Sequence, residues 1–450
     1  MTVDAWATLG VVSLTLVALV CHWTAPSITV LGAMVALLVL GVTTPAEALS
    51  GFANPAPITV AALYVLAHAM EKTGAIQPLL AWAFADPGSV RNRPTGVQDA
   101  PRRHRDRTRL PRIVWSSAGA SAVLNNTPIV AMLIPTLQAR ISPSGGTPSP
   151  WLMPISFAAI LGGTVTLIGT STNLVVSGLL ESAGHPPLGM FELTPVALPM
   201  ALAGIAIILR LAPRVFPERE EGTATLPPGP RRPSAVTSPG RPASREASHP
   251  AASLPAAGLV LMVTAAMVTL SAFGVLPILE GALTAALLMV AARVLTAKQA
   301  IAAIDLNVIL LIAASFGMGE AIRVSGLADV IAGGLVSTSA VLGPVAVLVA
   351  VVLCTILLTE VITNNAAAVL MFPIAVAAAI SIDAEPRPFA WAVALAASAS
   401  FLTPVGYQTN TMVYHPGGYR FADYARLGLP VTLVVAVLVV LGVSIRWGLF

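Results

Sequence analysis

The stretch Thr166-Leu167-Ile168-Gly169-Thr170-Ser171-Thr172-Asn173 returns later in the chain as Thr403-Pro404-Val405-Gly406-Tyr407-Gln408-Thr409-Asn410. Each copy interrupts an apolar segment, and a pair of asparagines precedes each one, Asn125-Asn126 in the first half and Asn364-Asn365 in the second. Asn126 and Asn365 are 239 residues apart, and Asn173 and Asn410 are 237 residues apart. This near-constant offset predicts that the chain is an internal duplication.

The composition indicates a membrane protein. Hydrophobic residues make up 56% of the chain and charged residues only 10%, whereas soluble proteins have about 25% charged residues. Apolar stretches of 17 or more residues recur along the whole length, which is typical of an all-α polytopic membrane protein. The alternating strands of about ten residues that mark a membrane β-barrel are missing from the sequence.

The first repeat is expected to cover residues 1–211. Its three scaffold spans lie near residues 6–23, 28–42 and 58–72. Residues 113–137 are apolar, but Asn125-Asn126-Thr127-Pro128 divides them into arms too short to cross a bilayer, which predicts a re-entrant hairpin. A span broken at Gly169 (residues 152–176) and an unbroken span (residues 196–211) complete this half.

The second repeat, residues 256–450, follows the same plan. We expect scaffold spans near residues 259–273, 276–295 and 307–322, a hairpin at 345–380, a broken span at 389–414 and a last span at 427–445. The prediction is therefore about ten spans plus two re-entrant hairpins. Five crossings in each half is an odd number, so the halves must have opposite orientations, and such an inverted repeat is typical of secondary transporters.

Two polar segments predict the orientation. Residues 86–112 hold eight arginines against three aspartates, and residues 212–255, rich in Pro, Ser, Arg and Glu, hold six arginines against four glutamates. The positive-inside rule places both in the cytoplasm of a plasma-membrane protein, with the second as a disordered linker. The second hairpin then enters from outside, opposite the first. Anionic lipid or nucleic acid could also bind such arginines, but orientation explains them better, so we expect no nucleic-acid partner.

The chemistry of the interruptions favours ions. A helix that begins in mid-membrane offers unpaired N–H groups and about half a positive charge to an anion. The carbonyl, amide and hydroxyl oxygens beside it are hard neutral ligands that suit Na⁺. No Lys, Arg, Asp or Glu lies in the cores of the four motifs, which predicts that an anion and its cations bind together.

Other readings of these residues remain open. One Asn-Asn pair alone is as well explained by polar residues that join transmembrane helices, and only the four matched motifs together favour binding. Glu360, three residues before Thr363, could carry a proton, help to hold a cation, or be a hydrogen-bonded structural residue. His68 is better explained by packing than by proton transfer. No metal-dependent, nucleophilic or phosphate-binding catalytic motif occurs, so we expect neither an enzyme nor an organic cofactor.

The chain resembles the divalent anion:sodium symporter family of sodium/sulfate and sodium/dicarboxylate carriers, which share the citrate-transporter-like domain. The resemblance spans nearly the whole chain except the linker. It rests most on three stretches: residues 124–135 (LNNTPIVAMLIP), 162–173 (GGTVTLIGTSTN) and 403–419 (TPVGYQTNTMVYHPGGY). The third is most similar to the sulfate-permease-type branch.

This resemblance implies a homodimeric elevator-type transporter with one sodium site in each repeat. The first site would use Asn125, Asn126, Thr127, Gly169, Thr170 and Asn173. The second would use Thr363, Asn364, Asn365, Gly406, Thr409 and Asn410. A small anionic substrate would lie between the hairpin tips, near Asn126, Thr127, Asn365, Thr170 and Thr409.

Both tips depart from the Ser-Asn-Thr that is typical of the carboxylate carriers. Asn125 and Asn364 stand in place of the serines, and Ala366 stands where a threonine is expected. The departures argue against a carboxylate and suggest that the second site has fewer hydroxyl groups.

The sequence thus predicts a sodium-coupled symporter, a permease for a small divalent anion, with sulfate favoured and a dicarboxylate or citrate next. The nearest alternative is an efflux carrier of the same superfamily for arsenite or another anion. An ion channel is the alternative from another class.

Overall fold

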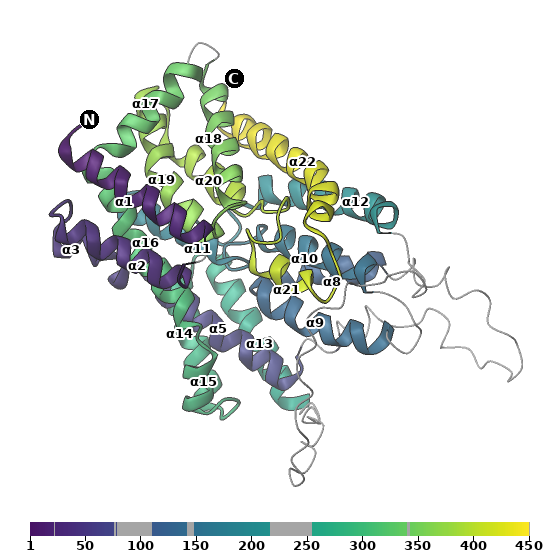
Figure 1. Cartoon of the computed structure of the whole chain (residues 1–450). Helices are drawn as coiled ribbons and strands as arrows, with labels where there is room; N and C mark the ends of the chain where they lie inside the picture. The colour runs from purple at the N-terminus through teal and green to yellow at the C-terminus, as the bar shows by residue number, and fades with distance from the viewer. Residues whose placement is uncertain are drawn as a thin grey trace, which may run out of the picture.

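The computed structural model describes residues 1–21, 23–75, 78, 110–141, 148–216, 254–339 and 343–449. Within these ranges every regular element is a helix (Figure 1). By length and composition, six of the helices could cross a membrane, and several apolar helices of 10–17 residues accompany them. The prediction of an all-α polytopic membrane protein is confirmed. Most of the predicted arginine-rich loop and of the linker lies outside the described residues.

Six helices match the predicted scaffold spans. They are α1 (Val3–Val20), α2 (Pro26–Val39), α5 (Pro55–Thr73), α13 (Leu254–Ala272), α14 (Ile278–Ala291) and α16 (Leu306–Val324). Glycines with a positive φ follow α5 and α16, at Gly74 (68°) and Gly326 (76°), where a side chain would be strained. Similar helix ends therefore occur at matching places in the two halves.

The predicted interruptions are gaps between helices. The first hairpin is α8 (Leu110–Ser121) and α9 (Asn126–Ile141), and the first broken span is α10 (Ser149–Gly163) and α11 (Ser171–Ser182). The second hairpin is α18 (Pro344–Thr359) and α19 (Asn364–Ser381), and the second broken span is α20 (Pro386–Ala397) and α21 (Gln408–Tyr414). The last spans are α12 (Thr194–Val215) and α22 (Phe421–Trp447).

Helix packing in one half matches that in the other. Helix α1 packs on α2 as α13 packs on α14, α8 on α10 as α18 on α20, and α10 on α12 as α20 on α22. Contacts between the halves also occur in pairs, α2 with α16 and α14 with α5, and α9 with α21 and α11 with α19. The last helices, α12 and α22, lie against each other (Figure 1). This pattern is what an approximate two-fold relation between the halves produces.

Four helices were not expected from the sequence. They are α3 (Pro45–Ala48), α4 (Ser50–Ala53), α15 (Ala297–Ala303) and α17 (Leu327–Ser339). Both α3 and α15 begin with a capping box, Thr44 with Glu47 and Thr296 with Gln299, which is a readable signal in the sequence. Helix α17 follows Gly326 directly. It is too short to cross a membrane, so the criterion of a long apolar stretch does not predict it.

Candidate functional site

The four interruptions surround one cavity of about 120 Å³. Its polar lining comes from both hairpin tips and both breaks: Asn125, Thr127, Ser171, Thr172, Thr363, Asn364, Asn365, Gly406, Tyr407, Gln408 and Thr411. Tyr64 on α5 and Val308 and Leu311 on α16 complete the lining on another side. All the lining residues are uncharged. A charged ligand in this cavity would therefore interact with polar groups and helix dipoles but with no charged side chain of the lining.

Helix N-termini meet at this cavity. Helix α9 begins at Asn126, α11 at Ser171 and α19 at Asn364, and the first turn of each contributes lining residues. The short helix α21 does the same from Gln408. The partial positive charges of these ends favour an anion between them.

The first break is held by Asn173. Its amide nitrogen donates to the carbonyls of Thr166 (2.9 Å) and Thr164 (3.4 Å). Asn173 Oδ1 and the Thr170 hydroxyl are buried and have no hydrogen-bond partner among the described residues. A Cβ on Gly169 would lie 2.5 Å from the Gly163 carbonyl oxygen, so only glycine fits there. The first break thus combines unpaired side-chain oxygens with closely packed backbone around Gly169.

The second break has the same frame with different partners. Asn410 donates to the carbonyls of Ser400 (2.9 Å) and Thr403 (3.4 Å). Its Oδ1, however, accepts from the hydroxyl of Ser156 on α10 at 2.7 Å, and that hydroxyl also lies 2.8 Å from the Thr409 hydroxyl. A Cβ on Gly406 would lie 2.5 Å from the Thr359 carbonyl oxygen. Both breaks therefore have a glycine packed closely against a backbone carbonyl, but only the first has an asparagine with an unpaired amide oxygen.

Each hairpin tip contacts the break of the other half. Thr127 Oγ1 donates to Gln408 Oε1 at 3.1 Å, and Asn365 Nδ2 donates to Ser171 Oγ at 3.2 Å. With the Asn126 amide oriented to satisfy both of its ends, its oxygen accepts from the Tyr407 hydroxyl at 2.5 Å and its nitrogen donates to the Gly169 carbonyl at 3.2 Å. Residues almost 300 positions apart in sequence thus form one polar site.

The pairing of the two tips differs by one residue from the sequence prediction. In the same orientation the Asn126 amide nitrogen donates to the hydroxyl of Ser121, the last residue of α8. At the other tip, Asn364 Oδ1 accepts from the hydroxyl of Thr359, the last residue of α18, at 2.9 Å. Asn126 therefore corresponds to Asn364, not to Asn365, and the offset is 238 residues. The prediction matched two Asn-Asn pairs by identity, but the helix starts fix the alignment.

This correction changes the comparison of the tips. Thr363 corresponds to Asn125 and Asn365 to Thr127, so the second tip reads Thr-Asn-Asn. Thr363 caps α19 with its hydroxyl, which accepts from the Ala366 N–H at 3.4 Å. The alanine at position 366 therefore does not leave this tip without a hydroxyl group.

The predicted site residues fall into two layers. Those that line the cavity are Asn125, Thr127, Thr363, Asn364, Asn365 and Gly406. Those that are not part of the lining are Asn126, Gly169, Thr170, Asn173, Thr409 and Asn410. Sequence reasoning missed Tyr64, Ser121, Ser156, Ser171, Thr172, Thr359, Tyr407 and Gln408, of which Ser121 and Thr359 are readable as hydroxyls five residues before the matched asparagines.

Glu360 is a buried hydrogen-bond acceptor that holds the second break. Its carboxylate accepts from the N–H groups of Phe401 (2.7 Å), Leu402 (2.8 Å) and Thr403 (2.9 Å). This geometry favours the structural interpretation that the sequence left open. His68 lies 3.5 Å from Glu71 on the same helix and is absent from the cavity lining.

The chain is similar to several known transporters. Residues 16–396 match the family model described as citrate transporter. The chain is 25% identical to an uncharacterized transporter of Synechocystis sp., over 98% of this chain and 97% of that protein. It is 34% identical to sodium/sulfate cotransporter 1 of Chlamydomonas reinhardtii, over 44% of this chain but only 22% of that protein. Among solved structures, the YdaH transporter of Alcanivorax borkumensis has a similar fold, with a TM-score of 0.60 at 14% identity over 90% of this chain and 88% of that one.

Proposed function

The chain belongs to the citrate transporter family and is a multi-pass membrane transporter, and we propose that it couples Na⁺ to the movement of a small divalent oxyanion. Sulfate is the favoured substrate, and dicarboxylates or citrate come next. The partial similarity to three sodium/sulfate cotransporters of Chlamydomonas reinhardtii supports this choice.

The observation that carries the proposal is an uncharged cavity lined by hairpin tips and helix N-termini. Neutral donors and helix dipoles bind an oxyanion without a fixed cationic side chain. A lysine or arginine in the cavity would hold the anion in the absence of any cation. Because the cavity has neither, anion binding depends on a cation that arrives with it, and this dependence is the thermodynamic basis of coupling.

We assign one sodium ion to each repeat. Hard cations prefer oxygen ligands, and the unpaired Asn173 Oδ1 and Thr170 hydroxyl support the first assignment. The first site uses Asn125, Asn126, Thr127, Gly169, Thr170 and Asn173. The second uses Thr363, Asn364, Asn365, Gly406, Thr409 and Asn410. The anion lies between them, near Thr127 and Asn365.

The proposed mechanism is alternating access by an inverted repeat. In it, the hairpins and broken spans move as one body against the scaffold helices, within a homodimer in the plasma membrane. The cavity lining supports this division, because Tyr64, Val308 and Leu311 are its only contributions from the scaffold helices among the described residues. The arginine-rich loop and the linker are cytoplasmic in this arrangement.

Uptake into proteoliposomes tests the function. With the full-length protein, an inward sodium gradient is expected to drive labelled sulfate, and succinate more weakly, whereas a potassium gradient is expected to drive neither. Anion uptake that ignores sodium would contradict the coupling. Anion export without sodium would favour the efflux carrier, and conductance far above carrier turnover in a bilayer recording would favour the channel.

Two substitutions test the site. Asn126→Ala and Asn365→Ala are each expected to abolish uptake while the protein remains folded, because each removes cross-repeat hydrogen bonds at the cavity. Asn307→Ala is the matched control, since this asparagine lies on the exposed side of α16 and accepts only from Ser27. Retained uptake in both site variants would overturn the assignment.

A further inference from the structure

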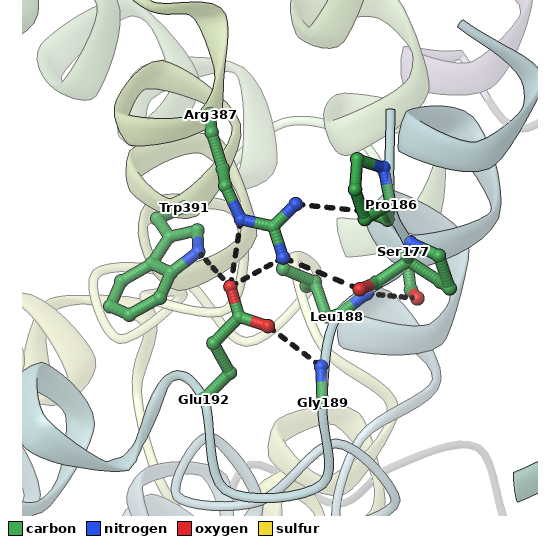
Figure 2. A network of polar contacts seen from close by, with 8 residues as sticks. Ser177, Pro186, Leu188, Gly189, Glu192, Arg387 and Trp391 are labelled. Carbon is green, nitrogen blue, oxygen red and sulfur yellow. Dashed lines mark hydrogen bonds and ion pairs between the residues drawn. The ribbon is translucent and has the colours of Figure 1, made fainter. Parts of the chain in front are cut away.

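An ion pair joins the two repeats away from the cavity. Glu192 lies in the loop between α11 and α12, and Arg387 is the second residue of α20 (Figure 2). Arg387 donates from two nitrogens to Glu192 Oε1, at 2.6 and 2.8 Å, and also to the carbonyls of Pro186 (2.8 Å) and Pro187 (3.3 Å). Their side chains are only 18% and 26% exposed, for Arg387 and Glu192 respectively. This is a well-formed clamp, unlike an isolated surface ion pair.

Glu192 is the centre of the clamp. Its Oε1 also accepts from the Trp391 indole at 3.2 Å, and its Oε2 accepts from the Gly189 N–H at 2.8 Å. The neighbouring Leu188 N–H donates to Ser177 on α11 at 2.9 Å (Figure 2). The loop is therefore held by α20, through Arg387 and Trp391, and by α11, through Ser177.

The residues that flank Glu192 hold the first break. The Met190 carbonyl accepts from the Leu167 N–H at 2.9 Å, and the Thr194 hydroxyl donates to the Val165 carbonyl at 2.6 Å. Leu167 and Val165 belong to the stretch that contains Thr166 and Gly169. Buried backbone groups need such partners, because a group left unpaired away from water is strongly destabilising. A shift of this loop would therefore change the shape of the break.

Within the described part of the chain, the second break has no such connection to a loop of the other half. Pro404 corresponds to Leu167 and has no N–H group to donate. The N–H groups of Phe401, Leu402 and Thr403 donate to Glu360 instead. Among the described residues, the hydrogen bonds from the loop that carries Glu192 thus reach the first break and not the second.

We propose that Arg387 is a positioning residue for the sodium site of the first repeat, although it belongs to the second repeat. Arg387 holds Glu192 and thereby the loop at residues 188–194. The bonds from Met190 and Thr194 then hold the break at residues 165–169. This break in turn determines where Gly169, Thr170 and Asn173 lie. The assignment of sodium to this site rests on the proposed function, but the mechanical connection does not.

Hydrogen exchange tests the connection without any substrate. In full-length Arg387→Gln, peptides that cover residues 160–170 are expected to exchange about tenfold faster than in the wild type, while peptides that cover 398–407 do not change. Glu320→Gln is the control, because its i,i+3 pair with Arg323 on α16 makes the same kind of contact elsewhere. Unchanged exchange at 160–170, or equal acceleration at both breaks, would overturn the inference.

Sodium dependence tests the consequence for transport. Arg387→Gln and Glu192→Gln are each expected to raise the half-saturating sodium concentration for uptake about fivefold, with less than a twofold change in maximal rate at saturating sodium. Arg387→Lys keeps the charge, is the safer variant for folding, and should restore part of this loss.

The two possible failures are distinguishable. A wild type without sodium dependence defeats the proposed function and leaves the exchange result standing. A sodium-dependent wild type with an unchanged half-saturating concentration in both Gln variants defeats the inference.

Discussion

The two broken spans have the same backbone pattern but are held in place by different groups. In both, an asparagine donates to two carbonyls of the break, and a glycine packs against the carbonyl at the end of the hairpin's first helix. The first break obtains its other partners from Met190, in the loop before α12, and from Thr194, the first residue of α12, while the second obtains them from Glu360 in its own hairpin. The duplication has preserved the requirement that buried backbone groups be paired, but not the residues that meet it.

The asparagines differ in the same way. Asn410 Oδ1 accepts from Ser156, but Asn173 Oδ1 has no partner among the described residues. The positions in α20 that correspond to Ser156 are Val393 and Ala394, and both are apolar. Buried amide oxygens are rarely left unpaired. The first proposed sodium site therefore has an unpaired amide oxygen that the second lacks.

The largest effect is expected where the two breaks are alike. Gly169→Ala and Gly406→Ala would each place a Cβ within about 2.5 Å of a backbone carbonyl oxygen, Gly163 in the first case and Thr359 in the second. Both variants should lose all measurable uptake, because the clash is with backbone that cannot move aside. Gly119→Ala, with open space around it on α8, is the control. If either variant transported at half the wild-type rate, the close packing of tip and break would not be essential.

The next effect separates the two breaks. Glu360→Gln replaces one carboxylate oxygen with an amide NH2 group, which cannot accept a hydrogen bond. In Glu360, Oε1 accepts from two N–H groups and Oε2 from one, so at least one of these donors loses its partner. With donors left unpaired at about 1–3 kcal/mol each, we expect a fall in melting temperature and a rise of at least tenfold in the half-saturating sodium concentration. Hydrogen exchange should accelerate at residues 398–407 and stay the same at 160–170, the reverse of Arg387→Gln. Acceleration at both breaks would mean that they are not held independently.

Much of this arrangement was predictable from the sequence, because the duplicated motifs are local. The positions of both hairpins and both breaks follow from Asn125-Asn126, Thr363-Asn364 and the two glycines. The exact register did not follow, because an Asn-Asn pair can be aligned in two ways and only the helix starts decide between them. The clamp of Glu192 and Arg387 was not predictable either, since its residues are 195 positions apart and carry no motif.

A smaller effect would make the second site resemble the first. Ser156→Ala removes the hydroxyl that donates to Asn410 Oδ1. We expect this oxygen to become available to the cation, so the half-saturating sodium concentration should fall about two- to threefold, while stability falls by about 1 kcal/mol. Ser116→Ala is the control, because that hydroxyl bonds only within its own helix, to the Arg112 carbonyl. An unchanged or higher sodium requirement would show that Asn410 Oδ1 is not a ligand.

The smallest effect concerns the counterpart of the Glu192 clamp. Tyr419 lies two residues before α22, as Glu192 lies two residues before α12, and its hydroxyl accepts from the Met153 N–H at 2.7 Å and donates to the Ser149 carbonyl. Tyr419→Phe removes only this neutral hydroxyl. Among the hydrogen bonds of the described residues, none joins its loop to the second break as Met190 joins Leu167 to the first. We therefore expect about 1 kcal/mol of lost stability, measured by thermal unfolding, and an unchanged sodium requirement. A sodium requirement that rises as much as in Arg387→Gln would mean that the loop before α12 and the loop before α22 both position their breaks. The asymmetry between the repeats would then lie in Glu360 and Ser156 rather than in the loops.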